Sequence, residues 1–156
     1  MTTVQKSFEQ LISIAIKREE EAHDFYTKAA EHAEQKSSAK LLLDLAKQEV
    51  KHKEKLQEAL GEGVCDTFTC ATLEEFESHD LSRYLLDIPL EPSSTSQDIL
   101  IVAIKREEAA RDFYKALSEL TGNASHRAVF ETLAKEEQGH KDRLEGMYDE
   151  HIQPWM

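Results

Sequence analysis

The chain has 156 residues, of which 40% are hydrophobic and 32% are charged, and its formal net charge is −12. The length fits one domain with a core or two small joined halves, and the composition is that of a globular protein rather than a disordered chain. The acidic surface disfavours nucleic acid and anionic membranes as partners, and no stretch approaches the roughly 18 apolar residues of a membrane span.

The first residues, "MTTVQKSFEQL", lack the basic start and the apolar run of a signal peptide. Cys65 and Cys70 are too few for a disulfide framework, which leaves a packing role and a loose redox pair as alternatives. We therefore expect a cytoplasmic protein.

Two helices are predicted in the first half of the chain. The first runs from about Ser7 to about Glu34, where the polar stretch "EQKSSAK" interrupts the apolar periodicity. Ser37 or Ser38 can cap the second helix, which ends near Leu60, before "GEG".

Residues 61–94 are expected to cross from one half of the chain to the other. Thr72 and Glu75 have the spacing of a capping box, which predicts a short helix from about Leu73 to Asp80. The stretch "DIPLEPSSTS" then indicates an extended loop. A connection of this length fits a helical bundle with a crossover that runs its full length.

Two further helices are predicted in the second half. Thr95 and Asp98 have capping-box spacing and start the third helix, which ends at "TGN", where the glycine is a natural stop. The fourth helix runs from Ala124 or Ser125 to about His151, because the proline that follows forbids much continuation.

Two phrases occur in both halves at the same offset of 88 residues. They are "AIKREEEAHDFY" (15–26) with "AIKREEAARDFY" (103–114), and "LAKQEVKHKEKL" (45–56) with "LAKEEQGHKDRL" (133–144). The constant offset indicates a duplicated helical hairpin, residues 7–60 and 95–151, joined by the crossover 61–94. Because one hairpin cannot bury its apolar face alone, we expect a single all-α four-helix bundle over residues 1–156.

Apolar residues recur in steps of four and three along each predicted helix. The four stripes are Phe8, Ile12, Ala15, Glu19, Ala22, Tyr26, Ala29 and Ala33; Leu42, Leu45, Glu49, His52, Leu56 and Ala59; Leu100, Ala103, Glu107, Ala110, Tyr114 and Leu117; and Phe130, Leu133, Glu137, His140, Leu144 and Met147. Each stripe carries one glutamate near its middle, and the second and fourth add a histidine three residues later. Of Glu19, Glu20 and Glu21, only Glu19 lies on a stripe.

Six polar residues therefore fall at one level of the predicted core. They are Glu19, Glu49, His52, Glu107, Glu137 and His140. Uncompensated carboxylates are strongly disfavoured in an apolar core, and two divalent cations would neutralise four of them. A lone Glu-x-x-His on a charged helix usually belongs to a solvated surface. A glutamate from each of two helices with Glu-x-x-His from the other two is instead a di-iron or di-manganese arrangement.

These residues resemble the ferritin-like di-iron carboxylate proteins, and among them the rubrerythrin-like branch. The matching motifs are Glu19-x-x-Ala22-x-x-x-Tyr26, Glu107-x-x-Ala110-x-x-x-Tyr114, Glu49-x-x-His52 and Glu137-x-x-His140. The resemblance covers all four helices, and it implies a ferritin-like four-helix bundle.

The resemblance also implies a role for each residue. The terminal ligands would be Glu19 and Glu107, the bridging ligands Glu49 and Glu137, and the histidine ligands, one for each iron, His52 and His140. Tyr26 and Tyr114 would form hydrogen bonds near the ligands, and the alternative for both is packing in the stripe.

Three departures from the rubrerythrin pattern bear on function. The chain has only "CDTFTC" where a rubredoxin-type domain needs paired Cys-x-x-Cys motifs, so electrons must come from a separate donor, such as a rubredoxin-like protein or a flavin reductase. Ala110 stands where rubrerythrins tend to have an extra glutamate. The acidic residue that precedes Glu-x-x-His in many relatives, and orients the opposite histidine, is present as Glu136 but replaced by Gln48 in the first half.

The expected function is reduction of hydrogen peroxide or oxygen at a dinuclear iron centre. An iron-binding or storage protein and a helical module with a structural metal are the alternatives. The ligand set also accepts manganese or zinc, so the sequence leaves the metal open. A homodimer is expected, because it is the commonest oligomer.

Overall fold

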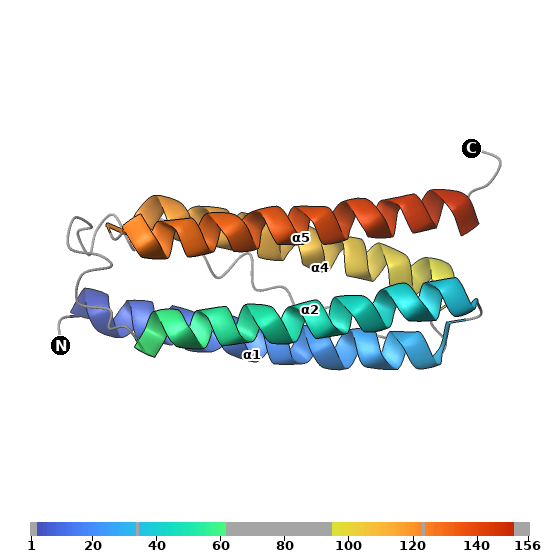
Figure 1. Ribbon diagram of the computed structural model, residues 1–156, viewed down its shortest axis with the longest axis horizontal. Helices are drawn as coiled ribbons and strands as arrows, with labels where there is room; N and C mark the ends of the chain where they lie inside the picture. The colour runs from blue at the N-terminus through green and yellow to red at the C-terminus, as the bar shows by residue number, and fades with distance from the viewer. Residues whose placement is uncertain (1–2, 34, 62–94, 123, 152–156) are drawn as a thin grey trace.

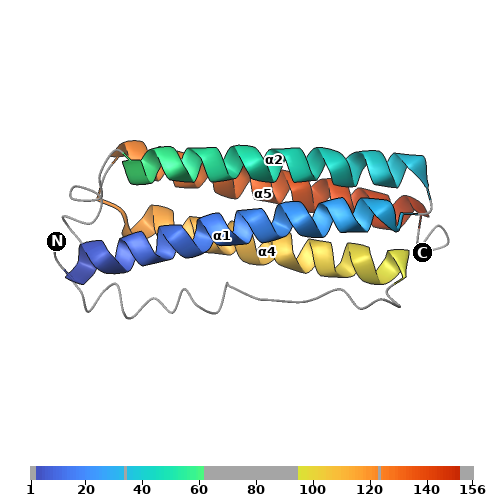
Figure 2. The ribbon, with the colours of Figure 1, turned by 90° about the horizontal axis from the view of Figure 1, so that it is seen from below.

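The structure, a computed structural model, describes residues 3–33, 35–61, 95–122 and 124–151, without the side chains of residues 3–11, 14, 60, 61 and 151. Its helices are α1 (Thr3–Glu31), α2 (Lys36–Gly61), α4 (Ser96–Leu120) and α5 (Ala124–His151). They lie side by side in an elongated bundle, and the described ranges contain no strand (Figure 1, Figure 2). The predicted all-α four-helix bundle is confirmed. None of these helices combines the length and the apolar composition that crossing a membrane requires.

The bundle consists of two antiparallel hairpins, α1 with α2 and α4 with α5 (Figure 1). Between the hairpins, α2 packs closest to α5. Helix α2 ends where α1 begins, whereas α4 begins at the opposite end of the bundle (Figure 1). The connection between α2 and α4 therefore joins opposite ends, as a lengthwise crossover requires. The predicted short helix from Leu73 to Asp80, and both cysteines, lie outside the described residues.

The predicted start of the third helix agrees with the structure. Oγ1 of Thr95 accepts a hydrogen bond from the Asp98 backbone N–H at 3.2 Å, and Oδ2 of Asp98 accepts one from the Thr95 N–H at 3.1 Å. This reciprocal pair is a capping box. The predicted cap of α2 is wrong, because α2 begins at Lys36 and places Ser37 and Ser38 in its first turn. The first helical bond runs instead from Ala39 N–H to the carbonyl of Gln35.

The apolar core is divided into two clusters of buried side chains. The Phe130 cluster comprises Ile12, Ala15, Leu56, Phe113, Tyr114, Ala116, Leu117, Leu120, Phe130, Leu133 and Ala134. The Leu45 cluster comprises Phe25, Tyr26, Ala29, Ala30, Leu42, Leu45, Ala46, Ile99, Leu100, Ala103, Leu144 and Met147. On each helix the glutamate of the predicted stripe lies between residues of the two clusters. The polar level of the core is therefore enclosed by apolar packing along the bundle in both directions.

The stripe residues whose side chains are described are all buried or half-buried. Phe8 lies outside them. Phe25 and Phe113 are buried as well, although neither lies on a stripe. Each phenylalanine packs beside the tyrosine that follows it, with ring centres 5.3 and 5.4 Å apart. The buried face of α1 and α4 is thus wider than a stripe in steps of four and three.

The capping box predicts a measurable effect on stability. Thr95→Ala removes the side-chain acceptor, and it should lower the free energy of unfolding by about 1 kcal/mol in urea denaturation. Thr132→Ala is the control, because the Thr132 hydroxyl is exposed and donates only to the carbonyl of Ala128 within its own helix. Equal losses in the two variants would contradict a specific role for the cap.

Candidate metal centre

The structure brings the six predicted ligand residues together in one layer of the core. Their exposed fractions are 4% for Glu19, 1% for Glu49, 0% for His52, 2% for Glu107, 2% for Glu137 and 5% for His140. All four helices contribute, because each stripe places its polar residues at the same height. Glu20, Glu21 and Glu108 are exposed, as expected for residues off the stripe.

Besides a group of three, His52, Glu137 and His140, the six side chains form two overlapping groups of four. Within each group the potential ligand atoms lie within 4.8 Å of one another. One group is Glu19, Glu49, His52 and Glu137, and the other is Glu49, Glu107, Glu137 and His140. Glu49 and Glu137 belong to both. Each group of four thus has one glutamate of its own, one histidine and two shared glutamates. That Glu19 and Glu107 are terminal ligands and Glu49 and Glu137 bridging ligands stays a prediction.

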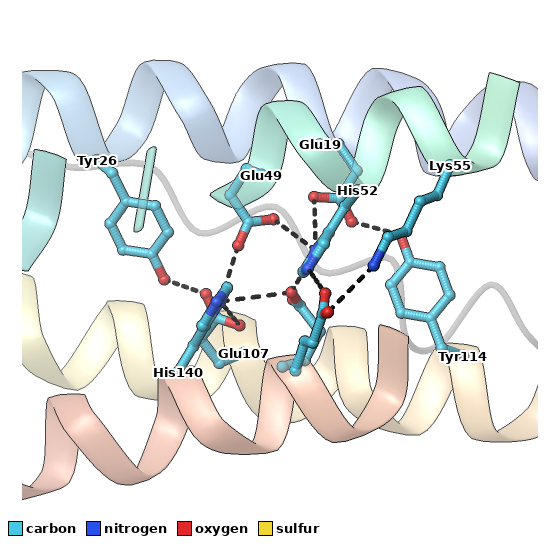
Figure 3. Close-up of polar contacts among 10 residues, drawn as sticks. Glu19, Tyr26, Glu49, His52, Lys55, Glu107, Tyr114 and His140 are labelled. Atoms are coloured by element: carbon cyan, nitrogen blue, oxygen red, sulfur yellow. Dashed lines mark hydrogen bonds and ion pairs between the residues drawn. The ribbon is translucent and has the colours of Figure 1, made fainter. Parts of the chain in front are cut away.

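Both histidines turn Nδ1 toward the carboxylates. Nδ1 of His52 lies 2.8 Å from Glu137 Oε1 and 3.6 Å from an oxygen of Glu19 and of Glu49. Nδ1 of His140 lies 3.1 Å from Glu49 Oε1 and 3.5 Å from an oxygen of Glu107 and of Glu137. The two rings are nearly parallel, with centres 5.5 Å apart. The Nδ1 atoms of His52 on α2 and of His140 on α5 therefore face the same cluster of carboxylates (Figure 3).

The two predicted tyrosines hold the terminal carboxylates of the opposite hairpin. The Tyr26 hydroxyl donates to Glu107 Oε1, and the Tyr114 hydroxyl donates to Glu19 Oε1. They flank the cluster on opposite sides (Figure 3). Burial raises the pKa of both hydroxyls well above the ordinary value, and the adjacent carboxylates raise it further. Both side chains are therefore neutral phenols that donate protons in hydrogen bonds.

Four atoms of the cluster are buried without a hydrogen bond of good geometry, although two of them, His52 Nδ1 and Glu137 Oε1, lie 2.8 Å apart as an ion pair. They are Glu19 Oε2, His52 Nδ1, Glu107 Oε2 and Glu137 Oε1. Burying such atoms unpaired costs about 1–3 kcal/mol each, and more when they are charged. All four belong to residues that could hold a metal ion, and bound cations would satisfy them. The donor set of carboxylate oxygens with one imidazole per position fits iron, manganese or zinc.

In the absence of metal, protons compensate the clustered charges. Burial raises the pKa of Glu19 and of Glu137 well above the ordinary carboxyl value, and neighbouring carboxylates add to this. Burial also opposes ionisation of Glu49, but hydrogen bonds from Glu19, His140 and His52 outweigh it and lower its pKa.

The same contacts make the imidazoles cationic. Burial lowers the pKa of His140, but hydrogen bonds with Glu107 and Glu49 outweigh it and raise the value from 6.5 to about 9. The pKa of His52 is also raised against its burial, chiefly by Glu137. A metal ion must displace these protons, so metal affinity should increase with pH.

A carboxylate and a lysine outside the cluster hold His52. Nε2 of His52 lies 2.6 Å from Glu136 Oε2, and the other oxygen of Glu136 accepts a hydrogen bond from Lys55 Nζ at 3.1 Å. Burial disfavours ionised Glu136, but Lys55 and His52 outweigh it and lower its pKa. The sequence identified Glu136 but missed Lys55, which is Arg143 in the second repeat.

A cavity of about 30 Å³ lies beside the cluster. Four of the glutamates, both tyrosines, and Arg18 and Arg106 are among its lining residues. The guanidinium of Arg106 lies over the ring of Phe25, 4.9 Å from its centre. Burial and the charge of Arg106 lower the pKa of Arg18. Neither arginine was predicted from the sequence, although Arg18 directly precedes Glu19 and Arg106 directly precedes Glu107 in the two copies of "KREE".

The raised pKa values predict how the metal-free protein responds to pH. The stabilising contribution of His140 is fully present below its ordinary pKa of 6.5 and is lost as the pH rises through about 9. The raised pKa values of Glu19 and Glu137 also make the metal-free protein less stable as the pH rises above 4.5, the ordinary pKa of a glutamate. The Tm of metal-free protein should therefore fall by roughly 5 °C or more between about pH 6 and about pH 9.

Thermal unfolding of metal-free and zinc-loaded protein, measured side by side across this range, provides the test. The difference in Tm between the two forms should widen with pH, because metal binding displaces protons. A metal-free Tm that rises with pH would contradict the assignment of buried, protonated ligands.

Substitutions of glutamates along one chain test which of them bind metal. Glu49→Ala and Glu137→Ala each remove a residue shared by both groups, so each should reduce bound iron from two ions per chain to less than one. Glu20→Ala and Glu21→Ala remove exposed carboxylates and should retain both ions. Elemental analysis after anaerobic ferrous loading measures the difference. Equal iron content in the four variants would contradict the register of α1 and the shared ligands.

Comparison with known proteins identifies a family and a fold. The sequence profile of the rubrerythrin family, described as "Rubrerythrin", matches residues 2–67 and 98–153. No curated protein sequence matches the chain significantly. A hypothetical protein from Pyrococcus furiosus has a similar structure, with a TM-score of 0.72 and 24% identity over 95% of this chain and 92% of that chain.

A protein from Thermotoga maritima described as a ferritin-like diiron-carboxylate protein is also similar. Its TM-score is 0.63, with 24% identity over 88% of this chain and 91% of that chain. At this identity the two structures establish the ferritin-like fold. The family profile covers most of both repeat halves, and the chain therefore belongs to the rubrerythrin family.

Proposed function

We propose that the chain is a non-haem di-iron oxidoreductase that reduces hydrogen peroxide or oxygen, as a peroxidase or a ferroxidase. The observation that carries this proposal is the pair of buried ligand groups that share Glu49 and Glu137. Membership of the rubrerythrin family supports iron as the metal. Two ferrous ions bound there would supply two electrons together to one molecule of oxidant.

The cavity beside the ligands favours a small oxidant. Its volume of about 30 Å³ holds one or two water-sized molecules. Hydrogen peroxide and oxygen fit this space, whereas an organic substrate requires a pocket on the order of 300 Å³ or more. The apolar clusters on both sides of the site keep bulk water out, which strengthens electrostatic interactions inside it.

The tyrosines are the best-placed proton donors for the reaction. Reduction of hydrogen peroxide to two waters takes up two protons together with two electrons. Tyr26 and Tyr114 line the cavity, and their hydroxyls are kept protonated beside Glu107 and Glu19. We assign them the role of holding a proton at the hydroxyl and orienting the terminal carboxylates.

The electrons must return to the site after each turnover. We propose that a separate donor protein supplies them, such as a rubredoxin-like protein or a flavin reductase, and that the enzyme acts as a cytoplasmic homodimer. The alternatives are an iron-binding or storage protein and a helical module with a structural metal. They differ from the main proposal in how bound ferrous iron responds to oxidants.

Rapid mixing of the anaerobically loaded ferrous protein with peroxide and with oxygen, in parallel, separates these functions. The absorbance of the oxidised di-iron centre reports the rate. Much faster oxidation by peroxide is expected for a peroxidase, and a comparable or faster reaction with oxygen indicates a ferroxidase that handles iron. Oxidation no faster than that of free ferrous iron would overturn the proposal in favour of a structural metal.

The role of the tyrosines is tested in the same experiment. Replacing Tyr26 and Tyr114 together by Phe should slow oxidation by roughly tenfold or more, because it removes both proton donors, while two irons remain bound. Tyr148→Phe is the matched control, since the Tyr148 hydroxyl accepts a hydrogen bond from Gln97, away from the cavity. An unchanged rate in the double variant would assign the tyrosines to packing alone.

A further inference from the structure

The two metal positions have matching ligands but different surroundings. At the offset of 88 residues, Glu136 corresponds to Gln48, and Lys55 corresponds to Arg143. The duplication therefore supplies an internal comparison, in which one chain holds the same histidine ligand in two different settings.

On the first side, Glu136 fixes the orientation of His52 and holds the proton on Nε2, so that a metal ion would displace the proton on Nδ1. A carboxylate only accepts hydrogen bonds, so Nε2 of His52 donates to Glu136 across 2.6 Å. The second oxygen of Glu136 is held by Lys55 at 3.1 Å. With its proton on Nε2, the imidazole directs Nδ1 at the carboxylates, and Nδ1 lies 2.8 Å from Glu137 Oε1. Lys55, Glu136 and His52 thus form a continuous chain from the protein surface to the site.

On the second side this chain is missing. Among the described residues, no carboxylate contacts Nε2 of His140, and the corresponding position holds the neutral amide of Gln48. Arg143, which corresponds to Lys55, pairs instead with Asp44 at 2.9 Å. Asp44 lies one helical turn before Gln48, and both members of this ion pair are exposed to solvent. The positive charge at this side is therefore directed away from the histidine.

From this difference we propose that the two positions bind metal with unequal affinity. The position of His52 fills first and retains its ion, whereas the position of His140 fills second and releases its ion first. A carboxylate that accepts the outer N–H of a histidine ligand raises the basicity of the imidazole and fixes its orientation. Loss of such a partner typically weakens metal binding 10- to 100-fold. The inference rests on the proposed dinuclear centre but not on the identity of its oxidant.

Cobalt titration of the metal-free full-length chain tests the inference without any turnover. Visible absorbance of bound Co²⁺, read against a competing chelator, should resolve two steps whose affinities differ by roughly tenfold or more. Glu107→Ala removes the terminal ligand of the His140 position and should leave one tight site. Glu19→Ala should leave one weak site. A tight remaining site in Glu19→Ala and a weak one in Glu107→Ala would overturn the inference.

Substitutions at Glu136 and Gln48, the two residues that differ beside the histidines, test directly whether they cause the difference in affinity. Glu136→Gln should weaken the first step by roughly tenfold or more, and Gln48→Glu should strengthen the second step by a similar factor. Both positions are half-buried at the edge of the site, so the fold should tolerate either change, which circular dichroism checks. Glu145→Gln is the control, because Glu145 pairs with Lys141 at 2.8 Å on the same helix without contacting a histidine ligand.

The two proposals fail in distinguishable ways. Two equal affinities in the unaltered protein, or a Gln48→Glu variant that binds no more tightly, would overturn the unequal positions and leave the dinuclear centre intact. Failure of the folded, unaltered protein to bind cobalt would overturn the proposed centre and this inference together.

Discussion

Enclosure of four carboxylates in one layer of an apolar bundle is the constraint on which this structure depends. The two clusters around Phe130 and Leu45 enclose the layer along the bundle, and its six side chains are at most 5% exposed, so bulk water does not surround the charges. Clustered carboxylates in such a site must be protonated, paired with cations or bound to metal. Without metal, two imidazolium groups and the protons on Glu19 and Glu137 compensate the charge. Metal ions would take over that role and satisfy the unpaired atoms as well.

This constraint also joins the two halves of the molecule. Each hairpin contributes three predicted ligands, yet both overlapping groups contain residues from both hairpins. The tyrosines also link the two hairpins, since Tyr26 donates a hydrogen bond to Glu107 and Tyr114 donates one to Glu19. Backbone packing is much closer within each hairpin than between the hairpins, where α2 and α5 approach each other most closely. The polar layer is therefore part of the interface between the repeats, and neither repeat contains a complete site.

The stripes identified the layer from sequence because helical periodicity reports burial directly. A glutamate in a stripe of Leu, Ala and Tyr must enter the core, which distinguished Glu19 from Glu20 and Glu21. Lys55 was not predictable in this way, because lysines are ordinary on exposed helix faces and its partner lies on another helix. The burial of Phe25 beneath Arg106 depends on how the two hairpins approach each other. The predicted cap of α2 was wrong because a serine after a turn can be either the N-cap or a residue of the first helical turn. The sequence does not distinguish the two, and the backbone conformation does.

The duplication shows which positions the chemistry constrains most strongly. The two repeats retain the same ligand types and the same tyrosines at the same spacing, whereas two positions around the histidines differ, Glu136 against Gln48 and Lys55 against Arg143. Loss of a ligand would leave a buried, uncompensated charge that the core cannot solvate. Replacement of Glu136 by a glutamine, as at Gln48, changes only a half-buried contact to the outer edge of a histidine. The buried glutamates and histidines of the layer are thus the same in both repeats, while the contacts around the two histidines differ, and the proposed difference in metal affinity rests on that contrast.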